Sequence, residues 1–281
     1  MSSPAATPAT SSGCRSKFSA ALSQPEPHLP KKRLGQHFLK DPNTARIVAR
    51  GVTTKDVILE VGPGRGALTR VLAEAAKLVH AVELDPDVLP ALQEALEPYR
   101  NVRVYEGDAL TFDYGALDPH PNKLVANLPY NVASPLVLKL LEEANFLGEL
   151  RFMVQLEVAR RMAAKRRTKD YGAYAVLVQL LAKVRVAHKV SPRVFDPPPR
   201  VWSAIVAMER RESPKDYERV KELVLAAFKS RRKRLVNNLP ETLRGEALET
   251  LRAMDYGPDV RAEELRPEDF VTLSRALSGA G

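Results

Sequence analysis

The 281-residue sequence lacks the features that define several protein classes. It has a single cysteine, Cys14, which excludes an intramolecular disulfide framework, and it has no apolar run long enough to cross a membrane. The first thirty residues contain only one acid, Glu26. They are of low complexity, so we expect a disordered tail over 1–30. An acid-poor, Ser-rich start is also typical of organellar transit peptides, but Arg is sparse in it, so we expect a cytoplasmic protein with an organelle as the alternative.

The rest of the composition is that of a globular protein with a strong basic excess. Hydrophobic residues make up 44% and charged residues 27%, which allows a sizeable core. Lys and Arg together number 43 against 34 acids, and the net charge is +9. Such an excess favours a polyanionic partner, with nucleic acid ahead of a membrane surface.

Between residues 56 and 162, short β-rich runs alternate with stretches of helical spacing. This alternation predicts an α/β fold with a parallel, doubly wound sheet. Two further β-like runs, 180–190 and 201–210, flank the Pro-rich SPRVFDPPPR and predict an antiparallel hairpin at the sheet edge. The five parallel strands are expected in 56–61, 78–85, 102–110, 123–130 and the first part of 151–162, where the fifth strand runs into a helix.

From residue 213 onward the pattern is helical only. Ser213 followed by Pro214 predicts a helix start, because Ser is a preferred N-cap and Pro suits the first helical position. We therefore expect a domain boundary near residue 211. The expected division is a catalytic domain over 31–211 and a small helical domain over 212–281.

A glycine-rich turn marks the cofactor end of the expected sheet. Gly62, Gly64 and Gly66 follow the first strand with the spacing G-x-G-x-G, one residue short of the dinucleotide motif. Glu83 and Asp108 follow the next two strands, and two acids at successive strand ends would repel a pyrophosphate. They suit an uncharged adenosine and a sulfonium cation, with Glu83 on the ribose and Asp108 on the adenine amine. This pattern favours S-adenosylmethionine over NAD, and capping of local turns is the structural alternative for both acids.

The fourth strand delivers the sequence NLPY to the same edge. An exocyclic adenine nitrogen is a poor nucleophile because its lone pair is delocalised into the ring. Two acceptors, the side-chain carbonyl of Asn127 and the main-chain carbonyl of Leu128, would hold its N–H groups and localise that pair. Pro129 restricts the geometry of Leu128, and Tyr130 offers a face for stacking the base. Catalysis would come from positioning and fixed dipoles, on a flipped or single-stranded base.

The motifs together resemble those of a known family. GQHFL (35–39), EVGPGRGALT (60–69), VELD (82–85), GDAL (107–110), NLPYNVASPL (127–136), VQLEVARRM (154–162) and YGAYAVLVQ (171–179) follow the order seen in the KsgA (RsmA) group of ribosomal RNA adenine dimethyltransferases. The resemblance extends from about residue 31 to the end. It implies a Rossmann-like class I S-adenosylmethionine-dependent methyltransferase fold with a small helical C-terminal domain, and no metal. It also implies dimethylation of the N6 amines of two adjacent adenosines near the 3′ end of small-subunit (16S) rRNA, with a role in subunit assembly.

The resemblance assigns further residues. His37 would close over the methionine part of the cofactor, and Phe195 in the Pro-rich loop would hold the target base against Tyr130. Trp202 stands where the family usually has an Asp. The full cofactor set implied or derived is His37, Leu39, Gly62, Gly64, Glu83, Asp108 and Asn127.

Three basic runs are candidates for phosphate contact. One of them, KSRRKR, has five basic residues in six and is expected on a helix, where some must face out. A solvated basic surface is the alternative. The expected partner is a small-subunit particle bound by a monomer, and the RNA-binding residues would be Lys31, Lys32, Arg33, Arg166, Arg167, Arg231, Arg232, Lys233 and Arg234.

Three other functions remain open from the sequence. An Erm-type enzyme shares the NLPY chemistry but modifies a large-subunit adenine, and a DNA adenine methyltransferase would differ in substrate. A non-catalytic rRNA-binding assembly or transcription factor could keep the fold. Such a factor would be expected to lose parts of NLPY or the glycines, and all of these are present.

Overall fold

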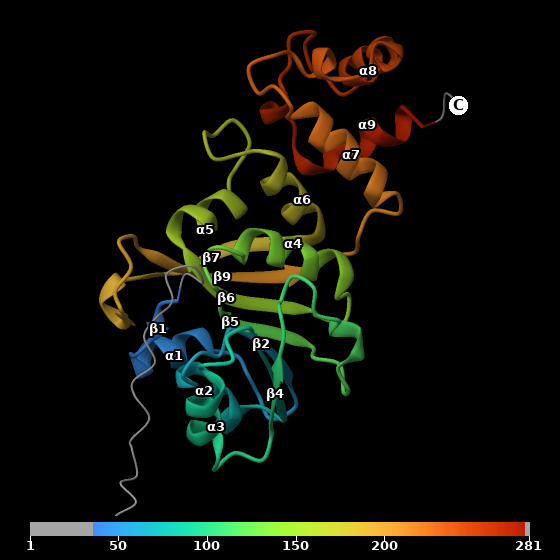
Figure 1. Cartoon of the computed structure of the whole chain (residues 1–281). Coiled ribbons are helices and arrows are strands. Elements are labelled where there is room, and N and C mark those ends of the chain that lie inside the picture. Colours follow the sequence, from blue (N-terminus) through green and yellow to red (C-terminus); the bar gives the residue numbers. More distant parts are fainter. Residues whose placement is uncertain (1–35, 279–281) are drawn as a thin grey trace, which may run out of the picture.

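The computed structural model describes residues 36–278, and the expected tail over 1–30 lies outside them, as do Lys31, Lys32 and Arg33. A seven-stranded sheet forms the centre of the larger part of the described chain, which precedes the C-terminal helices (Figure 1). Its strand order is β4-β3-β2-β5-β6-β9-β7. The strands are β2 (Val57–Val61), β3 (Leu78–Glu83), β4 (Val102–Glu106), β5 (Lys123–Asn127), β6 (Glu149–Gln155), β7 (Ala182–Val190) and β9 (Ser203–Arg210).

The pairing of these strands confirms the predicted topology. The five strands β4, β3, β2, β5 and β6 run parallel, β9 pairs antiparallel with β6, and β7 pairs antiparallel with β9 at the edge. The third strand is shorter than expected and ends at Glu106, so Asp108 lies in the turn beyond it. The sheet is therefore mainly parallel with an antiparallel edge hairpin.

Helices cover both faces of the sheet, and successive residues of one strand pack against different groups of helices. Ile58 belongs to one core cluster, with α1 (Pro42–Val48) and α2 (Ala67–Ala75), whereas the next residue, Leu59, belongs to the other. The second cluster contains residues of α4 (Ala133–Glu143), α5 (Leu156–Met162) and α6 (Ala173–Leu181). Apolar residues on both sides of a strand are what a doubly covered parallel sheet requires. The remaining helix of this part is α3 (Leu89–Leu96).

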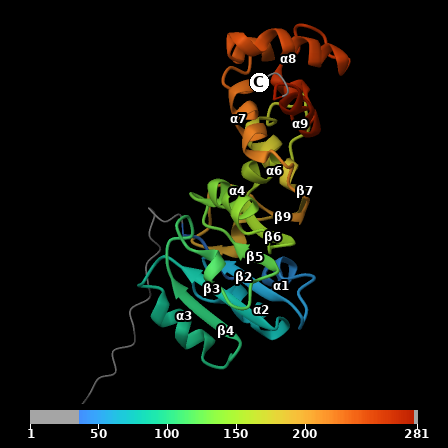
Figure 2. The same cartoon turned by 90° about the vertical axis from the view of Figure 1, so that its right-hand side faces the viewer.

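After β9 the described chain is helical, with α7 (Tyr217–Ala227), α8 (Glu241–Ala253) and α9 (Pro267–Ala276). These helices lie beyond the β7 edge of the sheet, with α6 between them and the strands (Figure 2). The larger core cluster is continuous from the sheet through α6 into α7 and α9, so the boundary expected near residue 211 remains a prediction. Within 36–278 no helix combines the length and the apolar composition needed to span a membrane.

The prediction of a helix start at Ser213 and Pro214 is wrong. The first C-terminal helix begins at Tyr217, with Asp216 as its N-cap residue, and the Ser213 hydroxyl donates to the Pro214 carbonyl oxygen at 3.5 Å. The helix begins where the chain first returns to the core. Tyr217 is buried there, and its hydroxyl donates to Glu142 at 2.8 Å.

The basic run 229–234 is also not helical, contrary to the prediction. Helix α7 ends at Ala227, and the run forms the turn before the 3₁₀-helix η4 (Leu235–Asn238). The side-chain amide of Asn238 donates to the carbonyl oxygens of Ala227 and Ser230 at 2.7 and 3.1 Å, which satisfies carbonyls at the end of α7. Ending the helix also allows Leu235 to reach full burial.

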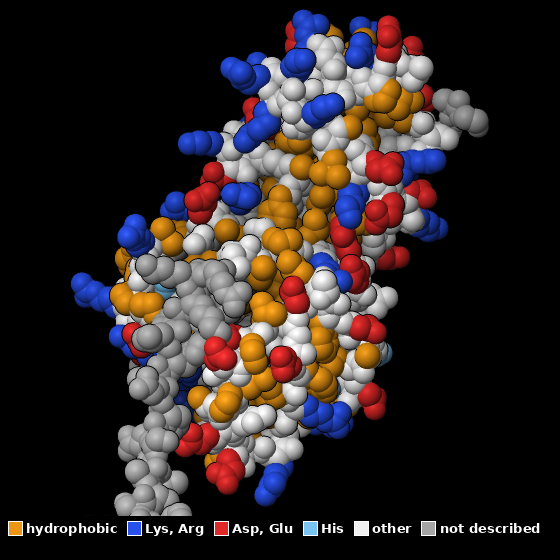
Figure 3. All heavy atoms as spheres, viewed as in Figure 1, with side chains coloured by type: hydrophobic (Ala, Val, Ile, Leu, Met, Phe, Trp, Pro, Cys, Tyr) orange, Lys and Arg blue, Asp and Glu red, His pale blue; other side chains and the backbone are white. Residues whose placement is uncertain are grey.

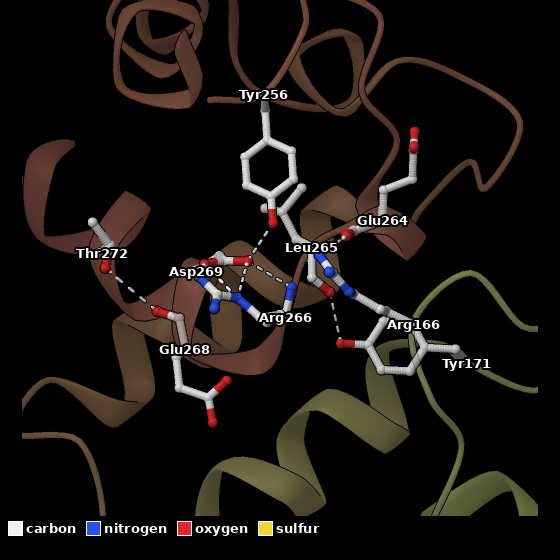
Figure 4. A network of polar contacts seen from close by, with 9 residues as sticks. All are labelled: Arg166, Tyr171, Tyr256, Glu264, Leu265, Arg266, Glu268, Asp269 and Thr272. Atoms are coloured by element: carbon white, nitrogen blue, oxygen red, sulfur yellow. Dashed lines mark hydrogen bonds and ion pairs between the residues drawn. The ribbon is translucent and has the colours of Figure 1, made fainter. Parts of the chain in front are cut away.

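A polar network joins the loop between α5 and α6 to the C-terminal helices (Figure 4). The buried hydroxyl of Tyr171 donates to the Leu265 carbonyl oxygen at 2.9 Å. Arg166 reaches the Glu264 carbonyl oxygen at 3.4 Å. Behind them the Asp269 carboxylate accepts from the Tyr256 hydroxyl at 2.5 Å and from the Arg266 guanidinium. The loop between α5 and α6 is thereby fixed to the segment that leads into α9.

Candidate active site

The glycine turn between β2 and α2 forms the floor of a pocket, and side chains do not fit there. Gly62 and Gly64 have φ values of +71° and +55°, which L-residues with a side chain rarely adopt. A Cβ on Gly64 would lie 2.9 Å from the Phe38 ring, and one on Gly62 would lie 3.2 Å from Pro129. The glycines therefore allow the cofactor motif and the NLPY motif to pack directly against each other.

Glu83 ends β3 and forms one wall of the pocket, as predicted. One carboxylate oxygen accepts from the Gly64 backbone N–H at 3.0 Å. The other accepts from the N–H groups of Leu84 and Asp85 at 2.9 and 3.0 Å. Burial raises the pKa of Glu83, and these three N–H donors oppose that shift. The contacts fix the carboxylate in place and leave its remaining lone pairs for hydroxyl donors.

Asp108 lies in the turn after β4 and lines the same pocket. Its Oδ1 accepts from the Leu110 N–H at 2.9 Å, and its carbonyl oxygen accepts from the Phe112 N–H at 2.8 Å. Both acids thus cap local turns and line the pocket as well. The turn contacts that were the structural alternative are therefore present, and the contacts of both acids with a cofactor remain a prediction.

Asn127 is the last residue of β5, and its side chain is held in one orientation. Its Nδ2 donates to the His37 carbonyl oxygen at 3.3 Å. Its Oδ1 is buried and has no hydrogen-bond partner among the described residues, although it borders the pocket. A buried acceptor without a donor is costly, so a ligand N–H is the partner that the geometry calls for.

Tyr130 stands beside this oxygen, at the start of the loop into α4. Its hydroxyl and the Ser203 Oγ share a hydrogen bond of 2.6 Å, which anchors the far end of the ring. The His37 ring lies 5.3 Å from the Tyr130 ring, tilted by 35°. The His37 Nδ1 donates to the Pro197 carbonyl oxygen at 2.8 Å, so the imidazole serves as a positioned wall of the pocket.

A short two-stranded strap borders the pocket, and it places Phe195 elsewhere than predicted. Strand β1 (Phe38–Leu39) pairs antiparallel with β8 (Phe195–Asp196). Phe195 is 0% exposed, belongs to the core cluster that contains Leu39, and does not line the pocket. The expectation that Phe195 faces the base opposite Tyr130 is therefore wrong for this conformation. Pairing with β1 turns the ring into the core, and the aromatic ring beside Tyr130 is that of His37.

The sequence reasoning missed a buried acid of the pocket, Glu60. Glu60 is 1% exposed, lines the pocket, and has an Oε2 without a hydrogen-bond partner among the described residues. Burial raises its pKa to about 8, and the nearby Glu83 carboxylate acts in the same direction. The available signal was a single carboxylate inside the otherwise apolar strand VILEV.

The pocket brings together most of the predicted cofactor and catalytic residues. It also includes residues that were not singled out, among them Phe38, Arg65, Leu84 and Asn131. The Arg65 guanidinium lies 4.5 Å from the centre of the Phe38 ring and 3.8 Å from the Asp196 carboxylate. The predicted residues in the lining are His37, Leu39, Gly62, Gly64, Glu83, Asp108, Asn127, Leu128, Pro129 and Tyr130.

The structure places two of the basic runs side by side, which the sequence did not predict. Arg231 donates to the Lys169 carbonyl oxygen and pairs with Glu263, both at 2.9 Å. Arg167 pairs with Glu264 at 3.2 Å, and Arg234 pairs with Asp259 at 2.7 Å. All predicted basic residues in the described part of the chain are exposed, and Arg232 and Lys233 form no ion pair with other described residues; the set is Arg166, Arg167, Arg231, Arg232, Lys233 and Arg234.

Known proteins are similar to this chain over nearly its whole length. Residues 28–278 match the family described as "Ribosomal RNA adenine dimethylase". The chain is 68% identical over 250 residues to "Ribosomal RNA small subunit methyltransferase A" of Rubrobacter xylanophilus, which covers 89% of this chain and 95% of that protein. The protein of the same name from Laribacter hongkongensis is 42% identical over 254 residues, covering 88% and 95%.

Two solved structures share this fold, which confirms the predicted class I methyltransferase fold. A dimethyladenosine transferase from Plasmodium falciparum superposes with a TM-score of 0.74 at 27% identity, covering 84% of this chain and 96% of that one. The 23S rRNA methyltransferase ErmE superposes with a TM-score of 0.68 at 31% identity, covering 86% and 99%.

Proposed function

Because the chain belongs to the ribosomal RNA adenine dimethylase family and is an rRNA adenine dimethyltransferase, we propose that it dimethylates the N6 amines of two adjacent adenosines near the 3′ end of 16S rRNA. The observation that supports this chemistry most directly is the buried Oδ1 of Asn127 at the pocket, which has no hydrogen-bond partner within residues 36–278. It is an acceptor positioned for an N–H of the substrate. The proposed small-subunit target follows the names of the similar proteins.

The pocket fits S-adenosylmethionine, the methyl donor that membership of a methyltransferase family implies. When bound, this cofactor supplies an electrophilic methyl group on a positively charged sulfur. Glu83 and Asp108 present fixed carboxylates to hydroxyl and amine donors, and Gly62 and Gly64 leave room where a Cβ would clash. The acids also disfavour a pyrophosphate, so a dinucleotide fits less well. Leu39 and His37 close the pocket from the strap.

In this proposal the NLPY residues act by holding the amine. The Oδ1 of Asn127 and the carbonyl oxygen of Leu128 accept its two N–H groups, which draws the nitrogen toward tetrahedral geometry. The hydrogen bond from Nδ2 to the His37 carbonyl oxygen fixes the amide, so Oδ1 needs no reorganisation. Tyr130, anchored by Ser203, provides the face against which the base stacks. No side chain needs to remove a proton before attack, because water can take it from the cationic amine afterwards.

We propose that the exposed basic residues hold the phosphates around the target. Arg232 and Lys233 are the best placed, since Arg231 and Arg234 already pair with acids. These contacts position the RNA and do not read its sequence. The proposed partner is a small-subunit particle bound by a monomer in the cytoplasm, and a role in assembly of that particle is part of the proposal.

The test is methyl transfer from labelled S-adenosylmethionine to three substrates. These are undermethylated small subunits, protein-free large-subunit rRNA and duplex DNA. Each is tested with the wild type, with Asn127→Ala, and with the matched control Asn43→Ala, which changes an exposed asparagine of α1. We expect label on the small subunit alone, reduced about 100-fold or more in Asn127→Ala and unchanged in the control.

Three outcomes would contradict the proposal or part of it. Label on large-subunit rRNA would move the protein to the Erm-type enzymes. Absence of transfer to any substrate despite RNA binding would leave an rRNA-binding assembly factor. Full activity of Asn127→Ala would refute the proposed role of the amide and leave the substrate assignment intact.

A further inference from the structure

The largest exposed hydrophobic side chain in the part of the chain that the structure describes lies close to the proposed base pocket. Trp202, the only tryptophan of the chain, is 52% exposed, and the preceding Val201 is 45% exposed. They lead into β9, just after the Pro-rich segment that follows β8. A half-exposed tryptophan leaves a large apolar surface in contact with water. Stacking against a flat apolar partner would bury that surface.

The backbone fixes this tryptophan at the rim of the pocket. The next residue, Ser203, is wholly buried and holds the Tyr130 hydroxyl at 2.6 Å. The Trp202 carbonyl oxygen accepts from the Leu156 N–H at 2.9 Å, which extends the pairing of β6 and β9 by one residue. Successive side chains of an extended chain point to opposite sides. The indole is therefore directed away from the side on which Ser203 meets Tyr130, and it does not line the pocket.

The charges around this rim favour a polyanion. Lys189, Arg193 and Arg200 are exposed and form no ion pair with other described residues. The only acid between residues 183 and 202 is Asp196, which lies 3.8 Å from Arg65. In Figure 3, hydrophobic side chains on the projection formed by the yellow-to-orange part of the chain in Figure 1 are flanked by Lys and Arg side chains. An aromatic face between cations is the arrangement that binds single-stranded nucleic acid.

We propose that Trp202 stacks against a nucleobase that flanks the target adenosine. This inference rests on the proposed function, because it requires that Tyr130 contacts the flipped base. The target base occupies the pocket side of Ser203. The neighbouring nucleotide of the same strand lies over the indole, with its phosphates near Arg200 and Arg193. Trp202 is then a specificity-determining residue at the rim and takes no part in methyl transfer itself.

The single tryptophan makes the contact directly measurable. Undermethylated 16S rRNA free of protein is titrated into the full-length wild type, and intrinsic fluorescence is followed together with quenching by acrylamide. We expect saturable quenching by the RNA and protection of Trp202 from acrylamide. Unchanged emission and unchanged acrylamide access, at RNA concentrations that saturate binding in a mobility-shift assay, would overturn the proposal. Quenching by anionic vesicles and not by RNA would also overturn it, in favour of a membrane contact.

Kinetics with two variants separate stacking from support of the fold. In Trp202→Ala we expect KM for undermethylated small subunits to rise about tenfold, the scale of one lost base stack. We expect kcat and S-adenosylmethionine affinity to stay near the wild-type values, and Trp202→Phe to recover most of the loss. The control is Leu225→Ala, because Leu225 on α7 is 51% exposed and lies far from the pocket in sequence.

The outcomes also distinguish this proposal from the proposed function. Weakened cofactor binding in Trp202→Ala, or equal loss in Leu225→Ala, would assign the residue to structure and overturn the contact. Wild-type methyl transfer without any effect of Trp202→Ala would remove the contact and keep the function. Quenching of Trp202 by RNA without wild-type transfer to any RNA would keep the contact and remove the function.

Discussion

The buried carboxyl of Glu60 should make the stability of the protein depend on pH. Burial raises the pKa of Glu60 from 4.5 to about 8. Between these values the folded protein binds the Glu60 proton and the unfolded chain releases it. The stabilising contribution is therefore fully present below pH 4.5 and is lost as pH rises through about 8. Glu60→Gln removes the titration while keeping the size of the side chain.

The expected size follows from the two pKa values. Linkage over that interval gives about 3.5 kcal/mol lost from the free energy of unfolding between about pH 5 and pH 8. The Gln side chain adds its own cost of a buried amide, but that cost does not change with pH. The difference between wild type and variant thus isolates the Glu60 proton, because groups that titrate alike in both proteins cancel.

The assay is urea unfolding of both proteins at several pH values from about 5 to about 8, without cofactor. We expect the wild-type free energy of unfolding to fall relative to Glu60→Gln as pH rises, most steeply around pH 6, midway between the two pKa values, and less steeply by about pH 8. Parallel curves would refute the reasoning, because they would mean that the Glu60 carboxylate finds solvent or a partner in the folded protein. A relative rise of wild-type stability with pH would reverse the sign and refute it as well.

Three further predictions concern the pocket floor and two structural contacts. Gly64→Ala should weaken S-adenosylmethionine binding in calorimetry, because its Cβ would lie 2.9 Å from the Phe38 ring at a φ of +55°, and Gly257→Ala, with open space around it, is the unchanged control. Arg210→Lys should lower the free energy of unfolding by about 2 kcal/mol, because the guanidinium donates to four carbonyl oxygens at the end of α4 and in the following loop. A loss below about 0.5 kcal/mol would contradict this prediction. Tyr171→Phe should lower the free energy of unfolding, measured in urea, by about 1–2 kcal/mol, because the Leu265 carbonyl oxygen loses the hydroxyl that joins the α5–α6 loop to the C-terminal helices. An unchanged unfolding midpoint would argue against this hydrogen bond.

The sequence predicted the sheet well because each strand carries its own signal. A run such as VILEV, followed by glycines and then by helical spacing, indicates a strand that ends at a ligand-binding edge whatever the rest of the chain does. Glu83 and Asn127 were found for the same reason, since the last residue of a parallel strand lies at that edge. These inferences need only local pattern and the rule that parallel strands end together.

The misses depended on contacts between distant segments. Phe195 follows a turn beside prolines, and only its pairing with Leu39, far away in the sequence, turns its ring into the core. The helix expected over the basic run ends at Ala227 because the amide of Asn238 satisfies its last carbonyls. Neither the pairing partner nor the capping residue can be identified from the local pattern.

The strap formed by β1 and β8 connects both halves of the proposed reaction. Leu39 of β1 and the preceding His37 line the pocket, and β8 leads to Pro197 and onward to the rim at Trp202. The His37 carbonyl oxygen also holds the Asn127 amide, and its ring is tied to the Pro197 carbonyl oxygen. A displaced strap would therefore open the cofactor pocket and release the amide that orients the amine. In the proposed reaction, cofactor binding and correct placement of the base therefore depend on each other, because the same segment of backbone supports both.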